Sequence, residues 1–285
     1  MDWTTILCRK AVCDAEQEFC NEFHAVVLPE NDTLSQVLKS GQIDSKRAIL
    51  VTNRKADWQE AKQLGLATLP YRQKNRQNLD AFEGAWMVAE GLADVDEEFL
   101  ELVYVRAHDL PWVALTTPRC YLRELTMDDM DALFALYAGK GICDYMEPLY
   151  PRAQEEAYEQ AYIQNMYRFY GYGMWLVCQK DTGKIIGRAG LEHRDYEGIT
   201  ELEMGYMIAT DEQQKGYATE VCEGLLAFAE THLPFEQITC LIQKENQVSV
   251  HLAEKLGFSF QKAYQEDKKT MLRYVRKLHA SDRKD

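Results

Sequence analysis

The feature that most constrains this chain is a glycine-containing loop between an expected strand and an expected helix. Residues 203–209 are rich enough in apolar side chains to form a strand, and the loop 213–218 follows them. From Gly216 onward, apolar residues recur at helical spacing, at Ala218, Val221, Cys222, Leu225, Leu226 and Phe228. Because the first turn of a helix has unpaired N–H groups and a positive dipole end, this arrangement predicts an anion site.

The expected anion is a phosphorylated cofactor that is held by backbone amides. Gly216 has no side chain, so a phosphate can approach the backbone closely at this position. The loop is not a Walker loop, because no Gly-Lys-Ser/Thr follows at the required spacing. It is not a dinucleotide-binding fingerprint either, because the three-glycine pattern is missing.

The loop resembles the acetyl-CoA pyrophosphate loop of the GNAT acetyltransferase superfamily, whose pattern is Gln/Arg-x-x-Gly-x-Gly/Ala. Gln213, Gly216 and Ala218 occupy the fixed positions of that pattern. Other segments, in the family's order, are similar to its first strand and helix, its central hairpin strand and its second half, at residues 117–129, 185–191 and 246–258. The resemblance covers about residues 116–278 and is closest to the ribosomal-protein N-terminal acetyltransferase branch.

The expected fold is an α/β protein of two domains, 1–115 and 116–285. The resemblance implies that the second has the GNAT acyltransferase fold, a mixed, mostly antiparallel sheet flanked by helices. Strands that alternate with helices over residues 25–106 predict a small Rossmann-like parallel sheet in the first. This half faintly resembles a degenerate haloacid-dehalogenase-like domain without its nucleophilic Asp. Thr52 and Asn53, at a strand end, are candidates for binding a small anion.

The resemblance also implies how acetyl-CoA would bind. In the superfamily the fourth strand separates from the fifth, and the pantetheine arm pairs with the free edge, here at residues 207–209. A backbone N–H of that edge, first of all that of Met207, would polarise the thioester carbonyl. The implied acetyl-CoA contacts are Met207, Ile208, Gln213, Gln214, Lys215, Gly216, Tyr217, Ala218, Thr219, Asn246 and Ser249.

Glu203 is the leading candidate for the general base, because it lies on the same strand just before the two strands separate. A buried carboxylate at this position could accept the proton of the attacking amine, directly or through a water. The alternative is a structural ion pair between Glu203 and Arg188 or Arg194 on the neighbouring strand. His193 is the second candidate for the base, and many members of the family need no dedicated base.

The group that protonates the leaving thiolate is less clearly indicated. The superfamily often places a Tyr seven residues after the Asn, but Ala253 occupies that position here. Ser249 resembles the serine found in the ribosomal-protein branch and could donate to the sulfur. The alternative role for Ser249 is capping of the helix that begins near Asn246.

The acceptor is expected to bind at the lip formed by Tyr145, Glu147 and Tyr150, because aromatic rings and a carboxylate suit an amine. The net charge of −14, with an excess of acidic residues in both halves, argues against nucleic acid as a partner. No run approaches the roughly 20 apolar residues of a membrane span, and no signal peptide is evident. The eight cysteines form no Cys-x-x-Cys pair, which predicts free thiols in the cytoplasm and no metal.

The resemblance therefore implies an acetyl-CoA-dependent N-acetyltransferase without a metal. Its acceptor would be a primary amine, either a protein N-terminus or a small-molecule amine, that attacks the thioester directly. Two other functions stay open, an acyl-CoA-binding sensor without turnover and a hydrolase that works through the N-terminal half. A homodimer is also left open.

Overall fold

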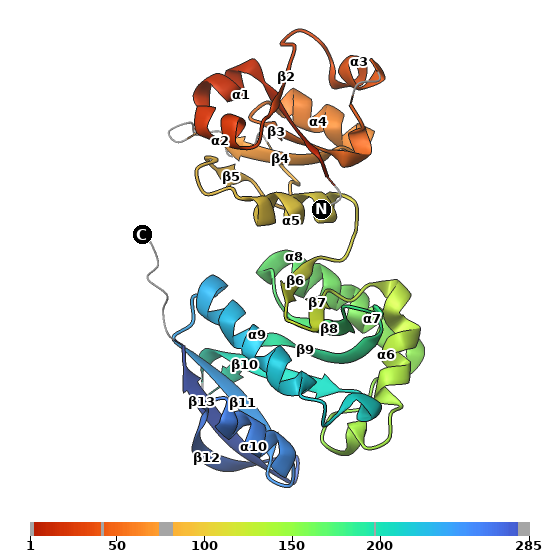
Figure 1. Cartoon of the computed structure of the whole chain (residues 1–285), viewed down its shortest axis with the longest axis vertical. Coiled ribbons are helices and arrows are strands. Elements are labelled where there is room, and N and C mark those ends of the chain that lie inside the picture. The colour runs from red at the N-terminus through yellow and green to blue at the C-terminus, as the bar shows by residue number, and fades with distance from the viewer. Residues whose placement is uncertain (1–2, 41–42, 74–81, 197, 279–285) are drawn as a thin grey trace. The chain divides into compact units, whose positions relative to one another are not determined.

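The chain forms two compact units in the computed structural model, which describes residues 3–40, 43–73, 82–196 and 198–278 (Figure 1). The units are Met1–Trp112 and Val113–Asp285. Strand β6 (Val113–Thr116) pairs with β7 (Cys120–Arg123) of the second sheet. The second unit therefore begins before residue 116, where the sequence had placed the boundary.

The first unit is a parallel sheet with helices, as predicted. Its strands lie in the order β2-β1-β3-β4-β5, and every pairing described in this sheet is parallel. The strands are β1 (Thr5–Arg9), β2 (Val26–Leu28), β3 (Ala48–Thr52), β4 (Ala67–Arg72) and β5 (Ala89–Glu90). The helices are α1 (Lys10–Ala15), α2 (Gln17–Glu22), α3 (Leu34–Lys39), α4 (Lys55–Leu64) and α5 (Glu97–Ala107). Strand β1 was not predicted, because the short apolar run there ends in a charged residue.

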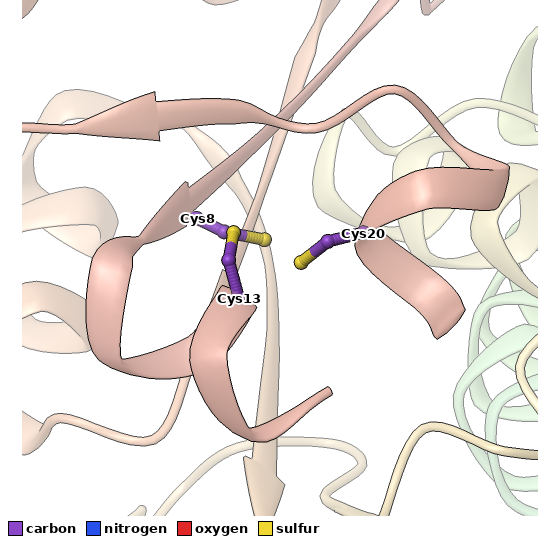
Figure 2. A group of neighbouring side chains, drawn as sticks. All are labelled: Cys8, Cys13 and Cys20. Carbon is purple, nitrogen blue, oxygen red and sulfur yellow. The ribbon is translucent and has the colours of Figure 1, made fainter. Parts of the chain in front are cut away.

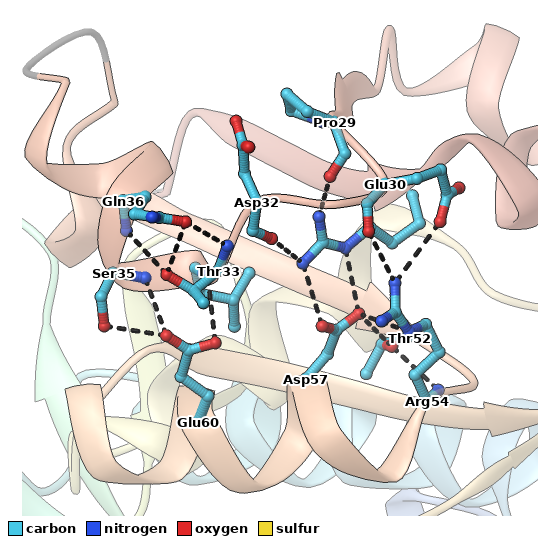
Figure 3. Close-up of polar contacts among 12 residues, drawn as sticks. Pro29, Glu30, Asp32, Thr33, Ser35, Gln36, Thr52, Arg54, Asp57 and Glu60 are labelled. Atoms are coloured by element: carbon cyan, nitrogen blue, oxygen red, sulfur yellow. Dashed lines mark hydrogen bonds and ion pairs between the residues drawn. The ribbon is translucent and has the colours of Figure 1, made fainter.

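That charged residue, Arg9, ends β1 at the point where strand order reverses between β1 and β3, and Figure 3 labels Pro29, Asp32 and Asp57 around this strand end. Only 1% of its surface is exposed. Its guanidinium donates to both carboxylate oxygens of Asp57 on α4, at 3.2 and 3.0 Å, and to the carbonyls of Pro29 and Asp32. Open α/β sheets commonly bind ligands at this edge, but here an internal ion pair occupies it.

The two residues predicted to bind a small anion also have partners within the unit. The Thr52 hydroxyl donates to Asp57 at 3.4 Å and accepts the backbone N–H of Arg54 at 3.0 Å. The Asn53 side chain donates to the Tyr71 hydroxyl at 3.4 Å. These contacts explain the polar strand end as part of the domain's own packing.

The second unit is built on a mixed, mostly antiparallel sheet, as predicted. The strands lie in the order β12-β13-β11-β10-β9-β8-β7-β6, and of the pairings described only that of β10 with β11 is parallel. The remaining strands are β8 (Met174–Gln179), β9 (Ile185–Tyr196), β10 (Ile199–Ile208), β11 (Gln237–Gln243), β12 (Ser259–Glu266) and β13 (Lys269–Lys277). The helices are α6 (Met130–Tyr137), α7 (Arg152–Tyr162), α8 (Arg168–Tyr170), α9 (Tyr217–His232) and α10 (Gln247–Lys255).

Helix α9 is anchored by the apolar stripe that its sequence predicted. Val221, Cys222 and Leu225 are fully buried. Phe228 on the same face meets the buried Trp175 of β8 edge-on, with 5.2 Å between ring centroids. This packing holds the first turn of α9 in a fixed place beside the end of β10.

The helical segment that begins with α7 is not one continuous α-helix. Helix α7 ends at Tyr162, and a π-helical turn, Ile163–Tyr167, leads into α8. A buried ion pair joins α7 to β9, with 2.7 Å between Nη1 of Arg188 and Oε1 of Glu159. Among the helices that the structure describes, none is both long and apolar enough to cross a membrane.

Candidate active site

Strands β10 and β11 separate directly after Glu203, and a pocket opens between them. In the described part of the chain these strands pair only at Leu202 with Ile238 and at Glu203 with Thr239. The pocket has a volume of about 760 Å³. Its wall is formed by the rest of β10, the loop before α9, the end of β11 and the start of α10.

The pairing of β10 with β9 decides which backbone amides face this opening. The Ala209 N–H donates to the Ile186 carbonyl at 2.8 Å, on the side of β9. Since N–H groups point alternately to the two sides of a strand, the Met207 N–H also points toward β9. The N–H groups of Tyr206 and Ile208 point to the side where β11 has left. The prediction that the Met207 N–H faces the co-substrate is therefore wrong by one residue. The N–H of Ile208 points in the direction expected for that role.

The loop before α9 has the concave backbone of an anion site. The Gln213 side chain donates to the Ile208 carbonyl at 3.0 Å and so ties the loop to the end of β10. Gln214 and Gly216 both have a left-handed backbone, with φ of +60° and +85°. Such conformations in a turn direct successive N–H groups inward, and the dipole of the 16-residue helix α9 adds to their positive potential. All of the predicted loop residues except Lys215 line the pocket.

Lys215 and Arg119 support the loop from outside the pocket. Lys215 Nζ pairs with Glu212 at 2.9 Å, and its carbonyl accepts Arg119 Nη1 at 3.0 Å. The Arg119 guanidinium lies 4.3 Å from the ring centroid of Tyr217 and pairs with Glu220 at 2.6 Å. The sequence analysis missed Arg119, because nothing local links it to a loop so distant along the chain.

Asn246 and Ser249 lie where the resemblance placed them, in the pocket wall at the start of α10. The Asn246 side chain accepts the Ser249 N–H at 3.2 Å, so Asn246 caps the helix and Ser249 contributes only its backbone to the cap. Tyr206, which the sequence analysis passed over, lines the same pocket with a buried hydroxyl. That hydroxyl has no hydrogen-bond partner among the described residues. Burial raises the pKa of Tyr206, and the neighbouring Ser249 side chain partly opposes this effect.

Glu203 lines the pocket and is also an ion-pair partner of Arg194, as the structural alternative predicted. Arg194 Nη1 lies 3.3 Å from Glu203, while Nη2 makes a shorter contact of 2.8 Å with Glu266. Burial is the main cause that raises the pKa of Glu203, and Glu192 and Glu266 add to it while Arg194 opposes it. Glu192 stands directly across from Glu203 on β9 and lines the same pocket.

The neighbours of Glu203 on β9 have different roles. Glu192 accepts the Tyr162 hydroxyl at 2.6 Å, and that hydroxyl accepts the Met174 N–H at 2.8 Å. His193, the second candidate for the base, does not line the pocket. Its Nε2 lies 2.6 Å from the Tyr172 hydroxyl, and burial lowers its pKa. His193 is thus part of an aromatic cluster, and the second carboxylate of the site is Glu192.

Of the three residues predicted to bind the acceptor, only Tyr145 lines the pocket. Its hydroxyl donates to the Glu245 carbonyl at 3.3 Å, and its own carbonyl accepts Gln243 Nε2 at 3.1 Å. Glu147 and Tyr150 lie outside the pocket wall, and 49% of Tyr150 is exposed. The prediction that Glu147 and Tyr150 form part of the pocket wall is therefore wrong, and Tyr145 is the one of the three that lines it.

Comparisons with known protein sequences agree with this geometry. A family model described as the acetyltransferase (GNAT) domain matches residues 119–259. The uncharacterized protein YkkB of Bacillus subtilis is 29% identical over 166 residues, which cover 58% of this chain and 96% of YkkB. The uncharacterized N-acetyltransferase YoaA of the same organism is 28% identical over 149 residues, which cover 50% of this chain and 81% of YoaA.

Solved structures share the fold of the same segment. A protein from Bordetella pertussis described as a GnaT-family acetyltransferase is 25% identical, with a TM-score of 0.51 over 57% of this chain and 98% of its own. RimL, a ribosomal-protein alpha-N-acetyltransferase in complex with coenzyme A, is 14% identical, with a TM-score of 0.51 over 60% of this chain and 100% of its own. At 14% identity, the likeness to RimL shows a shared fold and no more. The family model does not reach the first unit. Residues 119–259 of this chain thus form a domain of the GNAT acetyltransferase family.

Proposed function

We propose that this protein is an acetyl-CoA-dependent N-acetyltransferase that acts on a primary amine. The observation that carries the proposal is the pocket in which the loop before α9, the free edge of β10 and Glu203 come together. The description of the relative YoaA as an N-acetyltransferase supports the same reaction. Acetyl-CoA supplies an acetyl group that is activated as a thioester.

The residues present fit such a co-substrate. The backbone amides of residues 214–219 would hold the pyrophosphate, because they combine a concave loop with the N-terminus of a long helix. The free edge of β10 offers backbone groups to the amide-rich pantetheine arm, with Asn246 at the far wall. The Ile208 N–H, which points away from β9, would donate to the thioester carbonyl and stabilise the negative charge that develops there.

Glu203 is the proposed base. The bound ammonium first gives one proton to the Glu203 carboxylate, which frees the nitrogen lone pair for attack. The nitrogen then forms a bond to the acetyl carbon while the bond from that carbon to sulfur breaks, and its second proton passes to the solvent. The raised pKa of Glu203 favours the first of these proton transfers, because a stronger base accepts the proton more readily. Glu192, directly across the strand pair, adds a second negative charge that attracts the acceptor in its ammonium form.

Ser249 and Tyr206 are the proposed proton source for the leaving thiolate. Both line the pocket, and the Ser249 side chain is close enough to the Tyr206 hydroxyl to act on its pKa. A proton donated by Ser249 to the sulfur can be replaced from Tyr206 behind it. This pair would substitute for the tyrosine that the family often places where this chain has the buried Ala253.

The proposed acceptor is a cationic amine, either a protein N-terminus or a small molecule. The carboxylates of Glu192 and Glu203 in the pocket and a net charge of −14 both support a cation over an anion. We place the reaction in the cytoplasm, where the free cysteines of the described chain would remain reduced.

The test is calorimetric titration with acetyl-CoA, followed by measurement of thiol release with a panel of amines and N-terminal peptides. Binding together with acceptor-dependent release of thiol supports the proposal and identifies the acceptor class. Binding without release from any acceptor would favour a sensor of acyl-CoA instead. If acetyl-CoA did not bind at all, the proposal would be wrong.

A further inference from the structure

Three cysteines of the first unit come together although they are separated in the sequence. Cys8 lies on β1, Cys13 on α1 and Cys20 on α2. Their sulfur atoms all lie within 4.8 Å of one another. Figure 2 shows the three side chains directed into one space between the strand and the two helices. All three are free thiols.

The surroundings of this cysteine cluster leave one side accessible. Cys8 and Cys20 are buried, whereas Cys13 is partly exposed, so an ion can reach the sulfur atoms from the side of Cys13. The charge of Glu16, which lies between α1 and α2, acts on Cys20. A nearby carboxylate favours a cation at this place, and no cationic side chain is among the main influences on Cys8 or Cys20.

We propose that Cys8, Cys13 and Cys20 bind one soft, thiophilic metal cation, for which zinc is the reference probe. Zinc–sulfur bonds of about 2.3 Å place the sulfur atoms of a tetrahedral site roughly 3.8 Å apart. Sulfur atoms that already lie within 4.8 Å reach this spacing by small side-chain rotations. Three thiolates leave a fourth position for water or another small ligand on the open side of Cys13.

The chemistry of binding is balanced by proton release. Each thiol loses its proton to the solvent as its sulfur bonds to the metal, so a divalent cation with three thiolates has a net charge of −1.

A bound metal would also have a structural consequence. Helices α1 and α2 have six residues each, and helices this short are marginal unless something else holds them. Three metal–sulfur bonds would tie both helices to β1, which lies between β2 and β3 in the sheet. The first unit should therefore melt at a higher temperature with the metal than without it.

The experiment titrates the reduced full-length chain with Zn²⁺ under oxygen-free conditions, in competition with a chromophoric chelator. We expect one zinc ion per chain. Each of the variants Cys8→Ser, Cys13→Ser and Cys20→Ser should weaken zinc binding by more than about 100-fold. Loss of a residue that only supports a ligand typically costs up to about 100-fold, and loss of a ligand itself should cost more. Cys143→Ser is the matched control and should bind as the wild type, because Cys143 is an exposed thiol of the other unit.

A second measurement decides the question even if the variants fail to fold. The wild-type chain is alkylated with and without Zn²⁺, and peptide masses identify the protected cysteines. Protection of Cys8, Cys13 and Cys20 together supports the site. Absence of binding to the reduced wild type, protection of other cysteines, or wild-type affinity in folded variants would each overturn it. None of these outcomes depends on the proposed acetyltransferase activity.

Discussion

Gly216→Val tests whether the loop before α9 holds the pyrophosphate. Gly216 has a φ of +85°, a left-handed conformation that costs a residue with a side chain about 1–2 kcal/mol. A Cβ at this position would meet only the flexible end of Arg119, at 3.4 Å, so steric overlap adds little. For a unit of this size, the strain lowers the melting temperature by roughly 2–8 °C and leaves the protein folded.

The effect on acetyl-CoA binding is expected to be much larger than the effect on stability. Valine relieves its strain when φ returns to negative values, and this rotation turns the flanking N–H groups out of the concave loop. Loss of two charge-assisted hydrogen bonds, each worth about 1.5–3 kcal/mol, weakens binding by roughly 3–6 kcal/mol. This corresponds to an affinity about 10²–10⁴-fold lower.

The assay compares calorimetric binding and thermal unfolding in the wild type, Gly216→Val and a matched control. Gly183→Val is the control, because Gly183 has a φ of +69° in a turn outside the pocket and has nothing closer than 3.9 Å to its Cβ position. The control should lose similar stability and keep its affinity. Wild-type affinity in Gly216→Val would refute the reasoning, and equal loss in both variants would show that general instability, not the loop, is responsible.

Three further predictions concern side chains of the second unit. Glu203→Gln should lower kcat/KM by about 10²–10⁴-fold, remove the acidic limb of the pH–rate profile and spare acetyl-CoA affinity. Glu266→Gln, which removes the other carboxylate bound to the same arginine, should keep the acidic limb but move it to lower pH, because Glu266 helps to raise the pKa of Glu203. Because the folded-state pKa of Glu203 is raised, its contribution to stability is lost as the pH rises through that pKa, so Glu203→Gln should not lower the melting temperature at neutral pH. Tyr206→Phe should reduce kcat at least about tenfold without loss of stability, since it removes a buried hydroxyl that lacks a partner; an unchanged kcat would exclude the proton source that we propose. Arg188→Met should lower the free energy of unfolding by about 3–5 kcal/mol, because it leaves the buried Glu159 charge without its partner, and adding Glu159→Leu should recover most of this loss. Denaturant titration measures both variants, and a double variant whose loss is the sum of the two single losses would contradict this prediction.

Local sequence patterns predicted local structure well in this protein. Strands β3 and β11 each coincide with a compact apolar run that polar residues flank, so the local pattern is enough to locate them. The loop before α9 could be predicted because its function depends on consecutive residues. β1 was missed, because Arg9 looks like a surface residue in the sequence and is buried only through Asp57, which is distant along the chain. For Cys8, Cys13 and Cys20 the sequence predicted free thiols and no metal, because their spacing matches no metal motif.

The wrong assignment of the Met207 amide has a different cause. The strand was predicted, but the direction in which each of its backbone N–H groups points was not. Met207 and Ile208 are both apolar and both belong to β10, so composition cannot decide which amide faces the co-substrate. A shift of one residue in the pairing of β10 with β9 would exchange the directions of their two N–H groups. The phase is fixed by neighbouring strands, through the Ala209 bond to β9 and the bond from Thr239 of β11 to the Leu202 carbonyl. The sequence therefore predicts which residues form the strand, whereas its pairing decides which of their backbone groups can take part in the chemistry.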